Sequence, residues 1–522
     1  MNDQFAQALA VLPDYLGQHV LLSVSALLLA LLVALPLVVI SLRSAALRGP
    51  VIALASLVQT IPGLALMALF YPVLLALSAL LSPVGIRVPV LGFLPALLAL
   101  TLYALLPILR NAIAGLEGID PAVRQAALAV GMTPRQMFWQ VEAPLAAPVV
   151  MAGIRTAAVW TIGAATLATP VGQTSLGNYI FTGLQTENWV SVAFGCIASA
   201  ALAIMVDALL GIIERGIGQR RRAQVLASLA IMCVAVALAL APLAIKASAT
   251  GSSRAAVIGA KNFSEQFILA ELIAARLQAA GFQTAQRQGL GSAIAFRALA
   301  SGEIDVYVDY SGTLWTNILQ RSENLPREKM NAELARLLHE RFGVHVVGSL
   351  GFENAYALVM ARDRARSLGI ADIADLAPRA STLTFGADLE FLQRPEWKAI
   401  ATAYGLSFAA TRSFTPTFMY RALQSGEADI ISGFSSDGRI AADNLLVLRD
   451  SKGAIPAYDA LLLVSARRAG DAEFLFALKP LLNSIDVEAM RHANYSVDRD
   501  TDKLSPREAA QALGQQIGLK TR

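Results

Sequence analysis

A nine-residue segment that occurs twice in the second half of the chain carries the strongest sign of binding chemistry. Residues 297–305 read RALASGEID, and residues 421–429 read RALQSGEAD. Five residues beyond each final aspartate stands an aromatic residue followed by serine, Tyr310 in the first copy and Phe434 in the second. Each copy predicts a helix end, a Ser-Gly turn and a strand that carries a ring at its carboxyl end. Because ligands of open α/β sheets bind beyond the carboxyl ends of strands, we expect the two rings on opposite walls of one cleft.

Rings on facing walls suit a quaternary ammonium ion, because ring faces attract a cation that has no hydrogen-bond donors. The aromatic candidates for such walls are Phe263, Tyr310, Tyr356, Tyr420, Phe434 and Tyr458. A predicted helix start near Asn262 and Gln266 could hold a ligand carboxylate through its free backbone N–H groups. Thr313, Ser435 and Asp437 could orient the ligand. The alternative is that the repeat is a common turn and that its rings belong to the core.

The composition limits the function classes to be considered. Of the 522 residues, 56% are hydrophobic and 15% are charged, which is too apolar for an ordinary soluble protein. The net charge of +4 comes without a basic stripe interleaved with aromatic residues, so nucleic acid is not an expected partner. Neither the four histidines nor Cys196 and Cys233 have the spacing of metal ligands. The chain also lacks a Walker motif, G-x-x-x-x-G-K-(S/T), so we expect no ATPase activity, no catalytic residue and no cofactor.

The apolar residues gather in segments that are long enough to cross a bilayer as helices. These segments cover residues 19–42, 51–81, 88–109, 149–168, 189–213 and 225–245. Arginines follow the odd-numbered segments, among them Arg43, Arg110 and Arg220, and they are nearly absent from the other loops. The positive-inside rule therefore predicts an outside N-terminus, cytoplasmic Arg-rich loops and an extracytoplasmic C-terminal half. Asp207 lies within the fifth segment, where we expect it to reach the membrane interface rather than to act on a substrate.

The sixth segment joins the apolar half to the soluble half. We expect residues 1–222 to form a membrane domain with five spans, residues 223–253 a sixth helix and tether, and residues 254–522 a soluble domain. The sequence ASA at 247–249 also resembles the cleavage site of a signal peptide. The apolar run is longer than a usual signal core, which favours an uncleaved anchor that keeps the soluble domain at a high local concentration.

The loop 120–145 resembles the ATPase-coupling loop of ABC importer permeases. That loop reads Glu-Ala-Ala, three residues, Gly, nine residues and Ile-x-Leu-Pro. Ala126, Ala127, Gly131 and Pro144 match it in register, whereas Gln125, Val141 and Ala143 depart from it. The resemblance implies a MetI-like helical fold in the bacterial inner membrane, with a helix, a turn at Gly131 and a second helix seated in a separate ATPase subunit. An ordinary amphipathic loop is the alternative.

Five motifs of the soluble half resemble the periplasmic binding proteins for glycine betaine, carnitine and choline. They are GAKNFSEQ at 259–266, GLGS at 289–292, DYSGT at 309–313, YGL at 404–406 and SSDGRI at 435–440. The resemblance implies an α/β domain of type II with two lobes, about 255–356 with 460–517 and about 357–459, which close over the ligand. Strand–helix alternation predicts largely parallel sheets. Asn262 with Glu265 predicts a capping box at the start of a helix over 265–279.

These observations together predict a multi-domain chain that joins an α-helical polytopic permease to an α/β substrate-binding protein. The expected function is import of quaternary-ammonium compounds such as glycine betaine, choline or carnitine. The expected partners are two copies of a separate ATPase subunit, a small-molecule ligand, membrane lipid and a second copy of the chain. One alternative is import of another solute, such as an amino acid or a trimethylated histidine derivative. The other is a membrane-anchored sensor that transports nothing.

Overall fold

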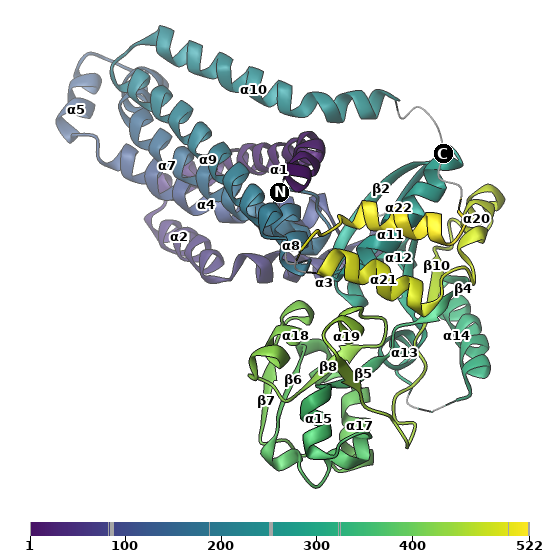
Figure 1. The fold of residues 1–522 in the computed structure, drawn as a ribbon. Helices are drawn as coiled ribbons and strands as arrows, with labels where there is room; N and C mark the ends of the chain where they lie inside the picture. The colour runs from purple at the N-terminus through teal and green to yellow at the C-terminus, as the bar shows by residue number, and fades with distance from the viewer. Residues whose placement is uncertain are drawn as a thin grey trace. The chain divides into compact units, whose positions relative to one another are not determined.

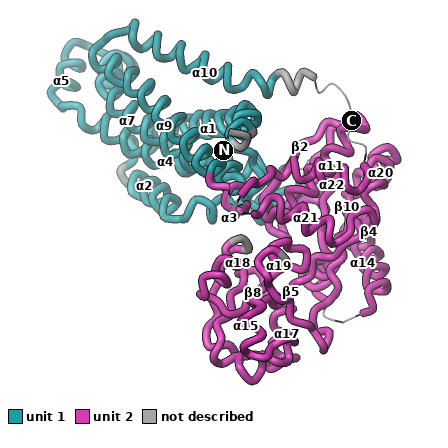
Figure 2. Tube along the Cα trace, viewed as in Figure 1, with its two compact units in different colours: residues 1–181, 190–251 teal, residues 182–189, 252–522 magenta. Residues whose placement is uncertain are grey.

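The computed structural model of this chain describes residues 2–81, 83, 88–186, 188–249, 254–321, 323, 325–499 and 501–519. Figure 2 shows its two compact units. The first comprises residues 1–181 and 190–251, and the second comprises residues 182–189 and 252–522. The end of the predicted tether, residues 250–253, lies outside the described residues.

The N-terminal half is helical (Figure 1). Within the described residues, six helices are long and apolar enough to cross a membrane, as predicted. They are α1 (Asn2–Arg43), α3 (Gly63–Leu81), α4 (Phe93–Glu117), α7 (Ala143–Ala165), α9 (Trp189–Gly218) and α10 (Arg222–Ala249). The shorter helices between them are α2 (Ala45–Thr60), α5 (Pro121–Ala129), α6 (Pro134–Met137) and α8 (Gly177–Gln185).

The second predicted segment, residues 51–81, is divided into two helices, α2 and α3. The break falls at Ile61, whose extended backbone (φ −74°, ψ 128°) is the conformation that a following proline favours. The Tyr103 hydroxyl of α4 donates a hydrogen bond to the carbonyl of Ile61, and the Gln59 side chain donates to the carbonyl of Tyr103 at 3.0 Å. The first bond satisfies a carbonyl at the break, and the second satisfies a carbonyl of α4 to which Pro107, four residues later, has no N–H to donate. Pro72, by contrast, lies inside α3.

The centre of the first unit is α4, which packs against α1 and α7 and is the most buried of the six long helices. Gly153 of α7 brings the two backbones close together. A Cβ atom added there would lie 2.6 Å from the Cβ of Asn111 and 2.8 Å from the carbonyl oxygen of Pro107. Small residues that admit such close approach are common between membrane helices.

An ion pair joins α7 to α9. The Arg155 guanidinium donates to both carboxylate oxygens of Asp207, at 2.5 and 2.6 Å, and lies 3.4 Å from Glu214. We expected Asp207 to reach the membrane interface, and this stays a prediction. In the structure its carboxylate accepts both bonds of a bidentate arginine pair, which links two membrane helices.

The second unit contains two five-stranded sheets. The first has the order β2-β1-β3-β10-β4, with strands Gln283–Leu290, Ala255–Lys261, Val306–Tyr310, Asp459–Val464 and His345–Glu353. The second has the order β7-β6-β8-β5-β9, with strands Ala410–Ser413, Thr384–Ala387, Ile430–Phe434, Tyr356–Ala361 and Leu445–Val447.

Each sheet is mixed, although the sequence predicted largely parallel sheets. β1 runs parallel to β2 and β3, and β6 runs parallel to β7 and β8. β10 is antiparallel to both of its neighbours, and so is β5. Each of these two strands follows a crossover between the sheets: β5 follows residues 354–355, and β10 follows residues 448–458. Each therefore enters its sheet from the opposite direction.

We name the part built on the first sheet lobe 1 and the part built on the second sheet lobe 2. Lobe 1 carries α11 (Ser264–Ala279), α12 (Ser292–Ser301), α14 (Arg327–Phe342), α20 (Ala472–Leu478), α21 (Val487–Asp498) and α22 (Pro506–Gln516). Lobe 2 carries α15 (Arg362–Leu368), α16 (Leu389–Gln393), α17 (Pro395–Tyr404), α18 (Pro416–Ser425) and α19 (Arg439–Ala442).

The two copies of the repeated segment have the local structure predicted for them. α12 and α18 each end before a glycine in the left-handed conformation, Gly302 at φ 78° and Gly426 at φ 76°. Glycine adopts this conformation without steric cost. The strands that follow, β3 and β8, end at Tyr310 and Phe434.

The aspartate of each copy fastens two neighbouring strands. Asp305 donates its N–H to the carbonyl of Val257 at 2.7 Å, and its Oδ2 accepts from the N–H of Val257 at 2.8 Å. Asp429 exchanges the same two bonds with Thr384, both at 2.9 Å. In both lobes, therefore, the same pair of aspartate hydrogen bonds positions the strand that bears the ring.

The close contact between α4 and α7 predicts that Gly153→Ala lowers the stability of the membrane unit. Overpacking of this kind costs about 1–3 kcal/mol. Gly163→Ala on the same helix is the matched control, because nothing lies within 4 Å of a Cβ added there. Thermal unfolding of the purified chain in detergent should show a lower Tm for the first variant only. Equal Tm values for both variants would contradict the close packing at Gly153.

Candidate functional site

A cleft of about 440 Å³ lies between lobe 1 and lobe 2. This volume is in the range of pockets that enclose small molecules. The carboxyl ends of β1, β3 and β8 reach it, which is where ligands of α/β sheets bind. Of the residues predicted to bind a ligand, the following line the cleft: Asn262, Phe263, Tyr310, Thr313, Tyr356, Phe434 and Tyr458.

Five of these residues form a continuous aromatic wall. The ring centroids of Phe263 and Tyr310 are 6.2 Å apart, and those of Phe263 and Phe434 are 6.1 Å apart with the ring planes within 3° of parallel. Tyr356 extends the wall, with its centroid 5.2 Å from that of Phe434 and 5.7 Å from that of Tyr458. The rings come from both lobes and from the second crossover, so the two lobes build this wall jointly.

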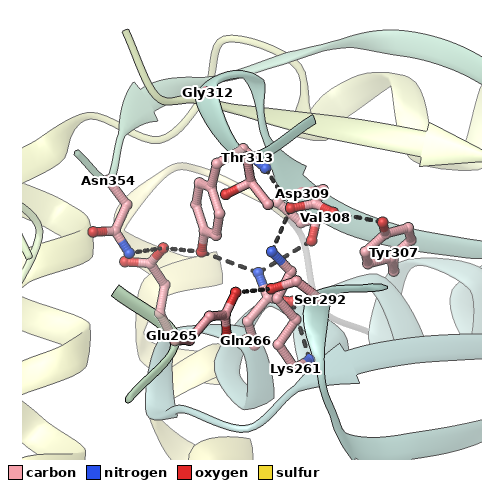
Figure 3. Close-up of polar contacts among 12 residues, drawn as sticks. Lys261, Glu265, Gln266, Ser292, Tyr307, Val308, Asp309, Gly312, Thr313 and Asn354 are labelled. Atoms are coloured by element: carbon pink, nitrogen blue, oxygen red, sulfur yellow. Dashed lines mark hydrogen bonds and ion pairs between the residues drawn. The ribbon is translucent and has the colours of Figure 1, made fainter. Parts of the chain in front are cut away.

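Two of the predicted ligand residues lie behind the wall. Gln266 donates its side-chain N–H to the carbonyl of Val308 at 3.1 Å and to the hydroxyl of Tyr310 at 3.0 Å, and so supports that ring (Figure 3). Tyr420 is buried in the core of lobe 2, where the Arg439 guanidinium lies 4.0 Å from its ring centroid. Neither residue lines the cleft.

Ser435 and Asp437 also lie away from the cleft lining. Ser435 bonds to Ala355 of the first crossover twice: its N–H donates to the Ala355 carbonyl, and its Oγ accepts from the Ala355 N–H, both at 2.9 Å. Asp437 accepts from the Arg439 guanidinium at 2.6 Å. A ligand contact by either residue stays a prediction.

The predicted capping box at the start of α11 is wrong. The residue before the helix is Phe263, and its side chain makes no capping hydrogen bond. Glu265 instead turns its carboxylate into the protein, where it accepts from the hydroxyl of Tyr310 at 2.5 Å and from the side chain of Asn354 at 3.1 Å (Figure 3). Tertiary hydrogen bonds thus replace the local cap.

A buried ion pair, which the sequence analysis missed, stands behind Tyr310. Lys261 at the end of β1 pairs with Asp309, and both side chains are almost fully buried. Asp309 also accepts from the Tyr307 hydroxyl at 2.6 Å and from the N–H of Tyr310 at 2.8 Å. The Lys261 ammonium lies 5.0 Å from the Tyr310 ring centroid. The pair therefore fixes the strand end that presents this ring (Figure 3).

Arg394 is a second cleft residue that the sequence analysis missed. It stands between α16 and α17 and is only 4% exposed. Its guanidinium donates to Glu390 at 2.5 Å and to Glu396 at 3.2 Å, and lies 5.1 Å from the ring centroid of Tyr356. Its Nε atom is buried without a hydrogen-bond partner among the described residues. Buried polar groups of this kind normally have a partner.

Asp388 is a third such residue. One carboxylate oxygen caps α16 by accepting from the N–H of Phe391 at 2.9 Å. The other oxygen is buried and has no partner among the residues that the structure describes. Burial raises the pKa of this carboxyl group. Arg394 and Asp388 both line the cleft, and each has one buried side-chain atom without a partner among the described residues.

The loop predicted to couple to an ATPase has the helix, turn and helix that were expected. α5 begins after Asp120, whose carboxylate accepts from the N–H of Ala122 at 2.8 Å. Gly131 follows in the left-handed conformation with φ 81°, and Thr133 opens α6 with a capping box. Arg124 donates to Glu142 at 2.8 Å and ties α5 to the segment that leads into α7.

The surface of this loop is unusually apolar. Large exposed side chains are Leu128, Val130 and Trp139, of which the last two are 73% and 71% exposed. Gln125, Ala126, Gly131 and Pro144 are also exposed, whereas Ala127 is buried. Exposed apolar side chains in such a group mark a surface that contacts another protein or the membrane.

Comparisons with known proteins agree with both units. Residues 255–515 match the family described as the substrate binding domain of ABC-type glycine betaine transport systems. Residues 26–219 match the family described as the inner membrane component of binding-protein-dependent transport systems. The family implies an ATPase partner and a small-molecule substrate.

Individual relatives cover either the whole chain or one unit. The ergothioneine transport permease/ergothioneine binding protein EgtU of Helicobacter pylori (strain G27) is 29% identical over 490 residues, which cover 90% of this chain and 84% of that protein. The choline transport system permease protein OpuBB of Bacillus subtilis (strain 168) is 39% identical over 198 residues, 38% of this chain and 84% of that protein.

A solved structure of a glycine betaine/carnitine/choline ABC transporter is 25% identical, with a TM-score of 0.44, and covers 50% of this chain and 98% of that one. The family matches span the membrane helices and the two-lobed domain in turn. The chain is therefore a multi-pass membrane protein that belongs to the binding-protein-dependent ABC importers, with permease and glycine betaine-type substrate-binding domain in one polypeptide.

Proposed function

We propose that this importer takes up a zwitterion that combines a quaternary ammonium group, a carboxylate and a hydrogen-bond donor. The observation that carries the proposal is the aromatic wall of a cleft that a guanidinium, that of Arg394, and a carboxylate, that of Asp388, also line. Each of the three matches one group of such a ligand.

The aromatic wall supports the ammonium group. A methylated cation has no N–H to donate, so it loses little when rings replace water, and each ring face contributes about 0.5–2 kcal/mol of attraction. The hydroxyl groups of Tyr310 and Tyr458 are already engaged, with Glu265 and Glu396 at 2.5 Å each. These two residues therefore offer the ligand their rings.

Arg394 supports the presence of a carboxylate in the ligand, since a buried guanidinium favours an anion over any neutral acceptor. Asp388 supports a hydrogen-bond donor in the ligand, because an ionised carboxylate of the cleft lining can only accept hydrogen bonds. Glycine betaine has no donor, and choline has no carboxylate. Carnitine and a trimethylated histidine have all three groups, which favours them over the two smaller compounds. Ergothioneine, named for one relative, is a trimethylated histidine derivative.

The exposed apolar surface of residues 120–145 supports transport rather than sensing. We infer that two copies of the chain form a permease dimer and that each copy seats this loop in one ATPase subunit. The binding domains then lie on the outer side, tethered by α10, and deliver ligand to the pore. ATP hydrolysis in the separate subunits drives the change of access.

The ligand class is tested by calorimetric titration of the detergent-purified full chain with choline, glycine betaine, carnitine, ergothioneine and histidine. Ergothioneine or carnitine should bind at least tenfold more tightly than glycine betaine or choline, because only they use all three groups. Histidine is the control for the methyl groups and should bind weakly. If histidine bound as well as ergothioneine, an amino acid would be the substrate and the proposal would fail.

The position of the rings predicts different effects at two aromatic residues. Phe434→Leu removes a ring from the cleft wall and should weaken binding of the preferred ligand by about tenfold, which corresponds to the 1–2 kcal/mol of one desolvated cation–π contact. Tyr420→Phe keeps every ring of the cleft wall and removes a hydroxyl that accepts a long hydrogen bond, 3.4 Å, from the N–H of Phe434, so it should change affinity less than twofold. The same titration measures both. An equal loss in both variants would place Tyr420 in the binding site after all.

A substitution at the Gly131 turn distinguishes the importer hypothesis from the sensor hypothesis. Gly131→Val places a branched side chain in a left-handed backbone, at a cost of about 1–2 kcal/mol, and should distort the loop. Uptake of labelled ligand by cells that express the chain with its ATPase should fall at least tenfold, while binding by the purified chain persists. Gly131→Asn is the matched control, because asparagine tolerates this conformation. Unchanged uptake in the valine variant would contradict coupling through this loop.

A further inference from the structure

Glu265 is a buried carboxylate that belongs neither to the proposed ligand contacts nor to the coupling loop. It lies in the first turn of α11 and is 2% exposed. It does not line the large cleft between the lobes, but it is hydrogen-bonded to Tyr310, one of the rings of the aromatic wall.

The two oxygens of Glu265 accept four hydrogen bonds. Oε1 accepts from the Tyr310 hydroxyl at 2.5 Å and from Asn354 Nδ2 at 3.1 Å. Oε2 accepts from Ser436 Oγ at 2.5 Å and from Asn494 Nδ2 at 3.0 Å. An ionised carboxylate has about four lone-pair sites, so the group is saturated.

The four donors come from four different parts of the second unit. Tyr310 ends β3 and is a ring of the cleft, and Asn494 lies on α21 of lobe 1. Asn354 lies in the first crossover between the sheets, and Ser436 follows β8 of lobe 2. Asn494 also donates to the Ser436 carbonyl at 3.0 Å. Both lobes, a crossover and the ligand wall therefore meet at one carboxylate.

This arrangement makes the solvation of Glu265 depend on the angle between the lobes. Burial raises the pKa of the carboxyl group, and the four hydrogen bonds act in the opposite direction. A rotation of lobe 2 that withdrew Ser436 would leave a buried charge with fewer donors, which is unfavourable in a low-dielectric interior.

We propose that Glu265 is a positioning residue that holds lobe 2 against lobe 1 in the arrangement that completes the ligand cleft, and that it ties this arrangement to the placement of the Tyr310 ring. The proposal deepens the proposed function, on which its ligand-binding readout rests. Its conformational readout is independent of any ligand.

The test is Glu265→Gln in the purified full chain. Glutamine has the same shape, but its NH2 group faces two donors and cannot accept from them. Glu271→Gln is the matched control, because Glu271 lies on the same helix, its carboxyl pKa is also raised by burial, and it accepts a hydrogen bond from Gln286 at 2.9 Å within lobe 1. Ser436→Ala is a second variant, which removes the donor of lobe 2 and leaves Glu265 in place.

The first measurement is the distance between the lobes, by double electron–electron resonance. Spin labels replace the exposed residues Arg297 of lobe 1 and Asp363 of lobe 2, in a background where Cys196 and Cys233 are serine. Without ligand, Glu265→Gln and Ser436→Ala should both shift the distribution to longer distances or broaden it. Glu271→Gln should reproduce the parent distribution.

The second measurement is the dissociation rate of the preferred ligand. This rate should rise at least tenfold in Glu265→Gln. The double variant with Ser436→Ala should release the ligand no faster than Glu265→Gln alone, because both changes break the same contact between Glu265 and Ser436. Parent-like distances and rates in both variants would overturn the proposal. If the parent chain bound no ligand of the panel, the proposed function would fail, and the distances would still decide the role of Glu265. If Glu265→Gln did not fold, Ser436→Ala would decide it.

Discussion

A charged group that is buried away from water must receive its partners from the protein, and this constraint organises the binding domain. Glu265, the Lys261–Asp309 pair and Arg394 are all buried close to the cleft. Each is held by groups from separate elements, so none can be satisfied until those elements have come together. The polar groups therefore specify one arrangement of strands and rings, whereas apolar packing alone would tolerate several.

The membrane unit obeys the same constraint for its backbone. Where Pro62 ends α2, the carbonyl of Ile61 loses its helical partner, and the Tyr103 hydroxyl replaces it. Where side chains cross the apolar region, Arg155 and Asp207 neutralise each other between α7 and α9. Close packing at Gly153 brings the backbones of α4 and α7 together.

Much of this architecture could be predicted because its signals are local. Apolar length revealed the six spanning helices, and the repeated segment at 297–305 and 421–429 revealed both strands that bear rings. Of the missed residues, Lys261 acquires its role through Asp309, which is far away in the sequence. Arg394 and Asp388 also have nearby partners, but their places in the cleft lining depend on the tertiary fold. Beyond its neighbours Glu390 and Glu396, Arg394 contacts Thr313 and Tyr356, which lie on other elements. The capping box failed for the same reason, since Glu265 found stronger partners in tertiary structure than its own helix offered.

The paired aspartates of the two lobes have a consequence for how ligand preference can change during evolution. Asp305 and Asp429 deliver Tyr310 and Phe434 from equivalent strand ends, yet the two rings are not equally constrained. Tyr310 is bound through its hydroxyl to Glu265 and Gln266, so replacing it disturbs a buried network. Phe434 has no hydroxyl to anchor it. Tyr310, on the lobe 1 side of the cleft, is thus fixed by its role in the fold. Phe434, on the lobe 2 side, can be replaced to change ligand selectivity without loss of the fold.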